Sequence, residues 1–339
     1  MCANCPDSAF QRVVARLRET PSLLAVAHAR PDGDGLGSML ALTLAAEAAG
    51  KAAAMLLPDA VPMRYQFLFA GRVPAGKERF AELAEQSALV VVLDTSNLEQ
   101  LEGIQPGIAA CRDKLVVIDH HATAGAIADL QWIDPSAAAV GVMVKELIDA
   151  LGWPLRPEAA EAILTAITAD TGWFQFANTD ARSLRAAARL LEGGLRADHL
   201  YRKLFQSDRP ERLRLTARML ASLELHCDGR LAVMTIAKGD FAASGARPEE
   251  TENLVNEVLR IGGVEVALLL VEQERFVRAS LRSRDAVDVA QIAQRLGGGG
   301  HARAAGVKLT DSVEAARTRV VAAVERELSG GHYGIIGRR

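Results

Sequence analysis

Short apolar runs alternate with amphipathic stretches through roughly the first 200 residues of this 339-residue chain, and this alternation constrains its fold more than any other feature. Runs rich in Val and Leu, bounded by polar residues, predict strands buried on both faces at 23–28, 88–94 and 114–119. Helical patterns follow at 36–49, 136–151, 157–170 and 180–191, with Ser136 as the expected N-cap of the second. This order is typical of an α/β fold with a doubly wound parallel sheet.

The pattern restarts after a charged helical stretch at 209–225, and the chain is long enough for two domains. Strands are expected at 231–237, 264–272 and 276–283, and helices at 249–261, 287–295 and 312–328. We therefore expect a doubly wound sheet domain over 1–205, a helical linker over 206–225 and a smaller C-terminal α/β domain over 226–330.

Composition excludes several classes of partner. With 39 basic and 42 acidic residues the net charge is −3, which argues against a protein that coats long nucleic acid, and 4% aromatic residues argue against a broad stacking platform for single strands. No apolar run reaches the roughly 18 residues of a membrane span, and the N-terminus does not resemble a signal peptide. The cytoplasm is therefore the expected location, without a membrane partner.

The four cysteines do not form a disulfide framework, which fits a reducing compartment. Cys2 and Cys5 make a C-x-x-C pair that could be half of a zinc knuckle. Because Cys111 and Cys227 lie far away without a second pair beside them, we do not expect a zinc site.

Histidine and aspartate follow three of the expected strands. The first strand leads into His28, Asp32 and Asp34, the second into Asp94, and the third into Asp119, His120 and His121, while Asp170 closes a helix. Any one of these His or Asp residues, taken alone, is typical of a turn or a helix cap. Because the carboxyl ends of parallel strands meet at one edge of a sheet, these side chains should gather there, and clustered carboxylates repel one another unless a cation is present.

Mixed imidazole and carboxylate ligands suit Mn²⁺. One ion could take His28, Asp32 and Asp94, and a second could take Asp34, Asp94, His120 and Asp170, so that Asp94 bridges them. Two neighbouring dications activate a water and clamp the attacking and leaving oxygens of a phosphoester, which favours phosphoester hydrolysis.

Six motifs carry a family resemblance. The segments HARPDGDGLGS (28–38), VLDTS (92–96), DHH (119–121) and ADTG (169–172) resemble the four motifs of the DHH phosphoesterases. SLRS (280–283) and GGGGHARAAG (297–306) resemble their DHH-associated C-terminal domain. The chain is most similar to the stand-alone branch of nanoRNases and adenosine 3′,5′-bisphosphate phosphatases. Gly35, Leu36 and Asn97 stand where many members have other residues, and none of these removes a ligand.

The resemblance implies the ligand assignment above, with two Mn²⁺ ions per site and Mg²⁺ or Co²⁺ as alternatives. It also implies that His121 contacts the scissile phosphate or aids the leaving group, and that Asp119 orients the histidines. An active site in the cleft between the two domains and a homodimer are expected on the same basis.

Glycines 298–300 could let backbone N–H groups converge on an anion as a nest. Within the resemblance, the substrate-binding residues are expected to be Arg282, Ser283, Gly298, Gly299, Gly300, His301 and Arg303. We expect Arg278 and Arg284 to be solvated surface charges. Trp173, Phe174 and Phe176 are expected in the core rather than stacked on a base.

The expected activity is hydrolysis of short oligoribonucleotides to nucleoside monophosphates, of adenosine 3′,5′-bisphosphate to AMP and phosphate, or of both. Cyclic-di-AMP phosphodiesterase activity on the same two-metal site and a non-catalytic nucleotide sensor are the alternatives. The GGGGH segment argues against a manganese pyrophosphatase, and the chain has no room for the further domains of the exonuclease branch. Asp32 and Asp34 lie where a dinucleotide pyrophosphate would approach, which disfavours a Rossmann oxidoreductase.

Overall fold

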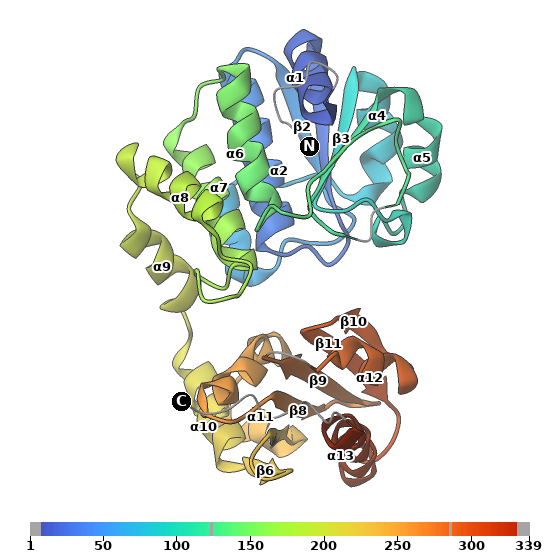
Figure 1. The fold of residues 1–339 in the computed structure, drawn as a ribbon, viewed down its shortest axis with the longest axis vertical. Helices are drawn as coiled ribbons and strands as arrows, with labels where there is room; N and C mark the ends of the chain where they lie inside the picture. Colours follow the sequence, from blue (N-terminus) through green and yellow to red (C-terminus); the bar gives the residue numbers. More distant parts are fainter. Residues whose placement is uncertain (1–7, 123–124, 285–286, 331–339) are drawn as a thin grey trace. The chain divides into compact units, whose positions relative to one another are not determined.

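The computed structural model describes residues 8–122, 125–284 and 287–330, and the chain divides into two compact units, Met1–Ser207 and Asp208–Arg339 (Figure 1). Cys2 and Cys5 lie outside the described residues. None of the helices in the described part combines the length and apolar character needed to cross a bilayer.

The first unit is built on a five-stranded parallel sheet with the strand order β2-β1-β3-β4-β5. Its strands are β1 (Ser22–Ala27), β2 (Ala52–Leu56), β3 (Leu89–Leu93), β4 (Leu115–Asp119) and β5 (Leu130–Ile133). Every residue of β3 and β4 is buried, as their unbroken apolar runs predicted. The sequence did not predict β2 and β5, the two edge strands, because one is largely alanine and the other is short and contains Gln131.

Helices cover both faces of this sheet, which confirms the doubly wound fold. The larger set comprises α1 (Ala9–Glu19), α2 (Gly33–Ala48), α6 (Val140–Leu151), α7 (Pro157–Asp170), α8 (Ala181–Glu192) and α9 (Ala197–Phe205), with α3 (Gln66–Phe69) beside them. On the opposite face lie α4 (Phe80–Gln86) and α5 (Gln105–Ala110). Short 3₁₀ turns occur at Met63–Tyr65, Lys77–Arg79, Leu98–Gln100 and Arg112–Lys114.

Ser136 is not the N-cap of α6, contrary to the prediction. The helix begins at Val140, and the Ser136 hydroxyl donates instead to Asp134 at 2.6 Å. The first N–H groups of α6 are satisfied by a side chain from a distant segment, described below, so the helix needs no local cap.

The second unit holds a six-stranded mixed sheet with the order β10-β11-β9-β8-β7-β6, in which the β7–β8 pair is parallel and the other pairs are antiparallel. The strands are β6 (Glu224–His226), β7 (Leu231–Ile236), β8 (Val266–Glu272), β9 (Val277–Ser283), β10 (Gly299–His301) and β11 (Ala304–Leu309). One face packs against α12 (Val289–Arg295) and α13 (Val313–Gly330). The other packs against α10 (Pro210–Ala221) and the 3₁₀ helix η6 (Leu254–Arg260), with α11 (Lys238–Ser244) and η5 (Pro248–Thr251) nearby in the chain.

Three segments of this unit differ from the sequence-based prediction. The helix expected over 209–225 stops at Ala221, and because Leu215 and Met219 are buried in the core of the second unit, it is part of that unit. The stretch 249–261 forms two 3₁₀ helices rather than one α-helix. Within the glycine-rich stretch, Gly299–His301 form the edge strand β10, which the sequence did not predict.

Candidate metal centre

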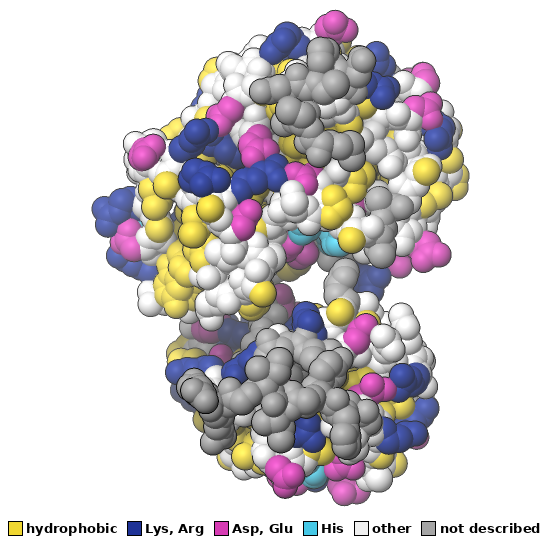
Figure 2. All heavy atoms as spheres, in the orientation of Figure 1, with side chains coloured by type: hydrophobic (Ala, Val, Ile, Leu, Met, Phe, Trp, Pro, Cys, Tyr) yellow, Lys and Arg dark blue, Asp and Glu magenta, His cyan; other side chains and the backbone are white. Residues whose placement is uncertain are grey.

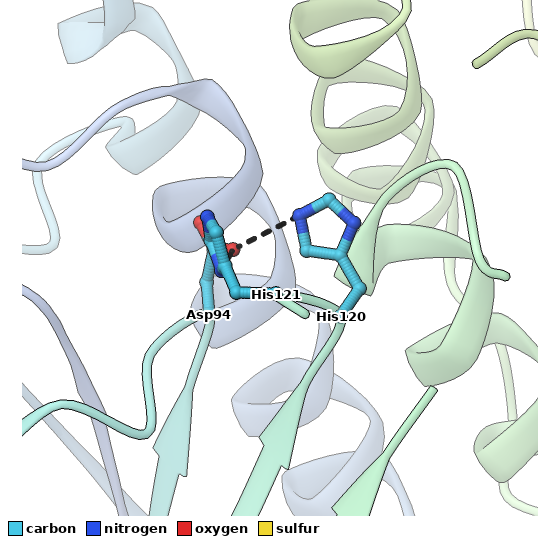
Figure 3. Close-up of side chains that lie close together, drawn as sticks. All are labelled: Asp94, His120 and His121. Carbon is cyan, nitrogen blue, oxygen red and sulfur yellow. Dashed lines mark ion pairs between the residues drawn. The ribbon is translucent and has the colours of Figure 1, made fainter. Parts of the chain in front are cut away.

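The candidate centre lies at the carboxyl ends of β1, β3 and β4. In the order β2-β1-β3, the chain leaves β1 toward one side of the sheet and later returns on its other side, so β1 and β3 flank the topological switch point where α/β proteins bind ligands. His28 directly follows β1, Asp94 follows β3, Asp119 ends β4, and His120 and His121 come next. Figure 3 shows Asp94 and the two histidines at the ends of neighbouring strands, with the His120 ring turned toward the Asp94 carboxylate.

The turn between β1 and α2 brings two more carboxylates to this edge. Asp32 is the N-cap of α2, and its Oδ1 accepts hydrogen bonds from the N–H groups of Asp34 and Gly35 at 3.0 and 3.1 Å. Asp34 lies in the first turn of the helix and is fully buried. Both carboxylates therefore lie at the positive end of the α2 dipole, which favours negative charge there.

Asp170 reaches the same edge because α7 packs unusually close to α2. A Cβ atom added at Gly37 of α2 would lie 2.3 Å from the carbonyl oxygen of Ala162 in α7, so only glycine allows this approach. Asp170 is the last residue of α7, and its Oδ2 lies 3.2 Å from His120 Nε2.

The six expected metal ligands form two groups around Asp94. In the first, His28 Nε2 lies 3.4 Å from Asp94 Oδ2 and 3.8 Å from Asp32 Oδ1. In the second, His120 Nε2 lies 3.9 Å from Asp34 Oδ2 and, as noted, close to Asp170. Asp94 Oδ1 is 3.6 Å from His120 Nε2, so the two oxygens of Asp94 face different groups.

Three observations fit a cation between these side chains. His28 Nδ1 and His120 Nδ1 lie 2.8 and 3.0 Å from backbone carbonyl oxygens, which only accept, so each ring directs the opposite nitrogen, Nε2, toward the carboxylates. Asp94 Oδ1 and His120 Nε2 are buried without a hydrogen-bond partner. A Cβ atom at Gly35 would lie 3.2 Å from His28 Nε2 and 3.3 Å from Asp94 Oδ2, so the missing side chain leaves space for a ligand.

The pKa values of these side chains are shifted because several carboxylates lie close together without a counter-ion. Burial and the charge of Asp32 raise the pKa of Asp94 to about 6, and burial together with Asp94 and Asp170 raises the pKa of Asp34 well above its ordinary value. Burial lowers the pKa of His28, but Asp32 and Asp94 outweigh it and raise that pKa to about 11. Without a metal ion, protons balance the charge of the carboxylates, and a bound dication would displace them.

Asp119 holds His121 rather than joining either group. It is fully buried, and it accepts hydrogen bonds from the Ser96 hydroxyl at 2.7 Å, from the His121 N–H at 3.1 Å and from His121 Nδ1 at 2.7 Å. Burial raises the pKa of Asp119, but the bonds from His121 and Ser96 outweigh it and lower that pKa. His121 Nδ1 is also 3.8 Å from Asp94 Oδ1, which places this imidazole beside the metal groups.

Ser96 was not singled out from the sequence, although it ends the segment VLDTS. A hydroxyl two residues after a strand-end aspartate is too common to indicate a role. Its hydrogen bond to Asp119 depends on the pairing of β3 with β4, which only the structure gives.

The expected substrate residues of the second unit lie on β9 and the β10–β11 hairpin. Arg282 and Ser283 end β9, Gly299, Gly300 and His301 form β10, and Arg282 lies opposite Ala304 in the sheet. Ser283 donates its hydroxyl to the Ala302 carbonyl at 3.3 Å, and Arg303 donates to the Val287 carbonyl at 3.2 Å. Gly300 has φ +145°, and a Cβ there would lie 2.4 Å from the Ala304 carbonyl, so this glycine is required by the hairpin itself.

The aromatic residues after the fourth motif divide between core and surface. Trp173 and Phe174 pack on the first-unit core, whereas the side chain of Phe176 is 55% exposed, against the expectation. Hydrophobic side chains also gather on the surface over α8 and α9 (Figure 2), including Leu184, Leu191, Tyr201 and Phe205.

Comparison with known proteins agrees with this arrangement. The DHH family, N-terminal domain, matches residues 22–167, and the DHHA1 domain matches residues 228–330. The bifunctional oligoribonuclease and PAP phosphatase NrnA of Thermus thermophilus is 34% identical over 98% of this chain and 100% of its own length. The chain belongs to the DHH family.

Two other proteins similar to this chain are less identical to it. The cyclic-di-AMP phosphodiesterase PdeA of Listeria monocytogenes is 25% identical over 72% of this chain but only 37% of its own length. The solved structure of an exopolyphosphatase-related protein from Bacteroides fragilis superposes with a TM-score of 0.90 at 23% identity, covering 96% of this chain and 98% of that one. That likeness shows that the two proteins share a fold.

Proposed function

We propose that this DHH protein is a two-metal phosphoesterase that hydrolyses short oligoribonucleotides to nucleoside monophosphates and adenosine 3′,5′-bisphosphate to AMP and phosphate. The observation that carries the proposal is the buried Asp94, whose two oxygens face two separate groups of imidazole and carboxylate ligands. The full-length similarity to the Thermus NrnA supports the choice of substrates.

The residues fit two divalent ions, and we propose Mn²⁺, with Mg²⁺ or Co²⁺ as substitutes. His28, Asp32 and Asp94 would hold one ion, and Asp34, Asp94, His120 and Asp170 the other. Such ions supply positive charge to the phosphate and lower the pKa of water at the site. Oxygen and imidazole ligands without thiolate are consistent with this choice of metal.

Within this proposal, His121 contacts the scissile phosphate or aids the leaving group. Asp119 and Ser96 fix the ring of His121 through two hydrogen bonds of 2.7 Å, so its position is set before substrate arrives. In the second unit, Arg282, with Ser283, Gly298, Gly299, Gly300, His301 and Arg303, would bind the terminal nucleotide and its phosphate.

A substrate panel tests the proposal. We would measure kcat/KM for a 5′-phosphorylated di- and trinucleotide RNA, adenosine 3′,5′-bisphosphate and cyclic-di-AMP, with Mn²⁺, Mg²⁺ and Co²⁺ in turn. Asp94→Ala, checked for folding by circular dichroism and for metal content, should lose both the metal and the activity. A metal-loaded chain that hydrolyses none of these compounds would point instead to a nucleotide sensor, and activity retained by Asp94→Ala would refute the bridging role.

The second candidate function is cyclic-di-AMP hydrolysis on the same site, which the similarity to PdeA favours. It predicts a higher kcat/KM for cyclic-di-AMP than for the linear dinucleotide. A cytoplasmic location, a homodimer and an active site in the cleft between the domains also stay predictions.

A further inference from the structure

One face of β9 carries a row of cations that the metal centre does not use. Along this strand Arg278, Ser280 and Arg282 are half-buried on one face, while the alternate residues are buried in the core. Across the sheet, Lys308 lies opposite Arg278 and Gly306 lies opposite Ser280 (the β9–β11 pair of Figure 1). Opposite residues of paired strands share a face, so Lys308 lies on the same face as Arg278, and Ser280 and Gly306 lie between these charges and Arg282.

Arg278 is not the solvated surface charge that the sequence predicted. Its Nη2 donates to the Thr251 hydroxyl at 2.5 Å, and its Nε is buried without a hydrogen-bond partner. Arg282 donates from Nη1 to the Leu281 carbonyl at 3.0 Å. Among the described residues, neither guanidinium lies within 4 Å of a carboxylate.

A half-buried arginine in the first unit, by contrast, has carboxylate partners. There, Arg182 donates to both Asp134 and Glu146 at 2.5–2.7 Å. Arg278 and Arg282 have only the charge of Glu252 acting in their favour, and burial lowers the pKa of both. A buried cation with an unused donor is unfavourable unless an anion joins it.

We propose that Arg278 binds a phosphate of an oligonucleotide substrate other than the terminal phosphate that Arg282 would hold. This inference rests on the proposed function, and it specifies that oligonucleotides, rather than adenosine 3′,5′-bisphosphate, bind more tightly because of the contact with Arg278. Four residues of strand separate the two arginines by about 13 Å, so they address different phosphates. Adenosine 3′,5′-bisphosphate carries both phosphates on one ribose and does not extend to Arg278, whereas a trinucleotide does.

The test compares Arg278→Gln with Arg275→Gln, which removes the same charge from an exposed position in the turn before β9. Losing a hydrogen bond to a charged group should raise KM for a 5′-phosphorylated trinucleotide about tenfold in Arg278→Gln. KM for the bisphosphate should change less than about twofold. Arg275→Gln should match the wild type for both, and Arg278→Lys should recover much of the loss.

A salt series separates a phosphate contact from a packing role. The slope of log Kd against log salt for the trinucleotide, measured in EDTA so that nothing is hydrolysed, should be shallower by about 0.7 in Arg278→Gln, as expected for one lost contact to a single strand. An unchanged slope with an equal loss for both ligands, or trinucleotide binding identical to wild type, would overturn the inference. If the wild type binds the trinucleotide but hydrolyses nothing, the proposed function fails while the phosphate contact stands.

Discussion

The carboxylate of Asp34 accepts a hydrogen bond of 2.6 Å from the backbone N–H of Val140, the first residue of α6 and 106 positions away in the sequence. A second bond of 2.8 Å comes from the N–H of Gly141. Ala139, the N-cap residue of this helix, has no side-chain oxygen that could accept a hydrogen bond. Asp34 of α2 caps the helix instead. One carboxylate thus serves both the candidate metal centre and the packing of α6.

Replacing Asp34 should therefore destabilise the chain even without metal. Asp34→Ala leaves two buried N–H groups without an acceptor, and at about 1–3 kcal/mol for each we expect a loss of roughly 3 kcal/mol in the free energy of unfolding. Urea denaturation of the metal-free protein measures it. Asp113→Ala, which removes an exposed carboxylate from the same unit, is the control, and it should shift the free energy of unfolding by less than about 0.5 kcal/mol. Equal losses in both variants would contradict the capping role.

Removing the Ser96 hydroxyl should slow catalysis without emptying the metal site. Ser96→Ala deletes the bond that helps to hold Asp119, and outer partners of this kind typically contribute about 10- to 100-fold. We expect kcat to fall within that range while metal content measured by mass spectrometry stays the same. Ser136→Ala, an exposed serine of the same unit, should be silent. A normal kcat in Ser96→Ala would show that the orientation of His121 does not depend on this bond.

Gly37→Ala should be destabilising, although alanine is normally favoured over glycine in a helix by about 1 kcal/mol. The added methyl would meet the Ala162 carbonyl, so α2 and α7 must separate, which costs about 1–3 kcal/mol. Because α7 ends in Asp170, Mn²⁺ affinity should fall as well. Gly239→Ala in α11, where an added Cβ meets nothing within 4 Å, serves as the control and should be neutral or slightly stabilising.

The metal-free protein should become less stable as the pH rises. The pKa of His28 is about 11 in the folded chain and about 6.5 when unfolded, so the folded state holds an extra proton between these values and its stability is lost through that window. The raised pKa of Asp94, about 6 against 3.8, acts with the same sign at lower pH. Denaturation in EDTA should show the free energy of unfolding falling by up to about 1.4 kcal/mol per pH unit and per proton above neutrality.

His28→Gln should make this dependence shallower but not abolish it, because it removes only one of the imidazoles that take up a proton, and the pKa of another, His120, is also raised, to about 10. Saturating Mn²⁺ should reverse the trend for the wild type, since the metal competes with protons for the same ligands. A metal-free wild type whose stability does not change between about pH 7 and pH 9 would show that His28 is not protonated there.

The sequence predicted the buried strands and the convergence of their terminal residues because both follow from simple rules. Unbroken apolar runs such as that of β3 require burial on both faces, and parallel strands bring their carboxyl ends to one edge. His28, Asp94 and His120 could therefore be placed together before any contact was known. Edge strands lack this signal, which is why β2 and β5 were missed.

What the sequence could not give depends on contacts between distant segments. Ser136 satisfied the local rule for an N-cap, yet the start of α6 is decided by Asp34. Four successive glycines indicate a flexible turn or a nest, but pairing with β11 places Gly299 and Gly300 in a strand. Arg278 was expected to be a solvated surface charge, but it is half-buried on β9 and donates to the Thr251 hydroxyl.

The backbone of Asp94 has φ +63°, a left-handed conformation that is unfavourable for any residue with a side chain, and its N–H is held by the Ile118 carbonyl at 3.0 Å. Such a conformation typically carries about 1–3 kcal/mol of strain, which glycine would relieve. The backbone is thus strained at Asp94, the residue that faces both groups of ligands. A descendant that gave up hydrolysis would be released from this constraint, and a glycine at position 94 would be an early mark of such a pseudoenzyme.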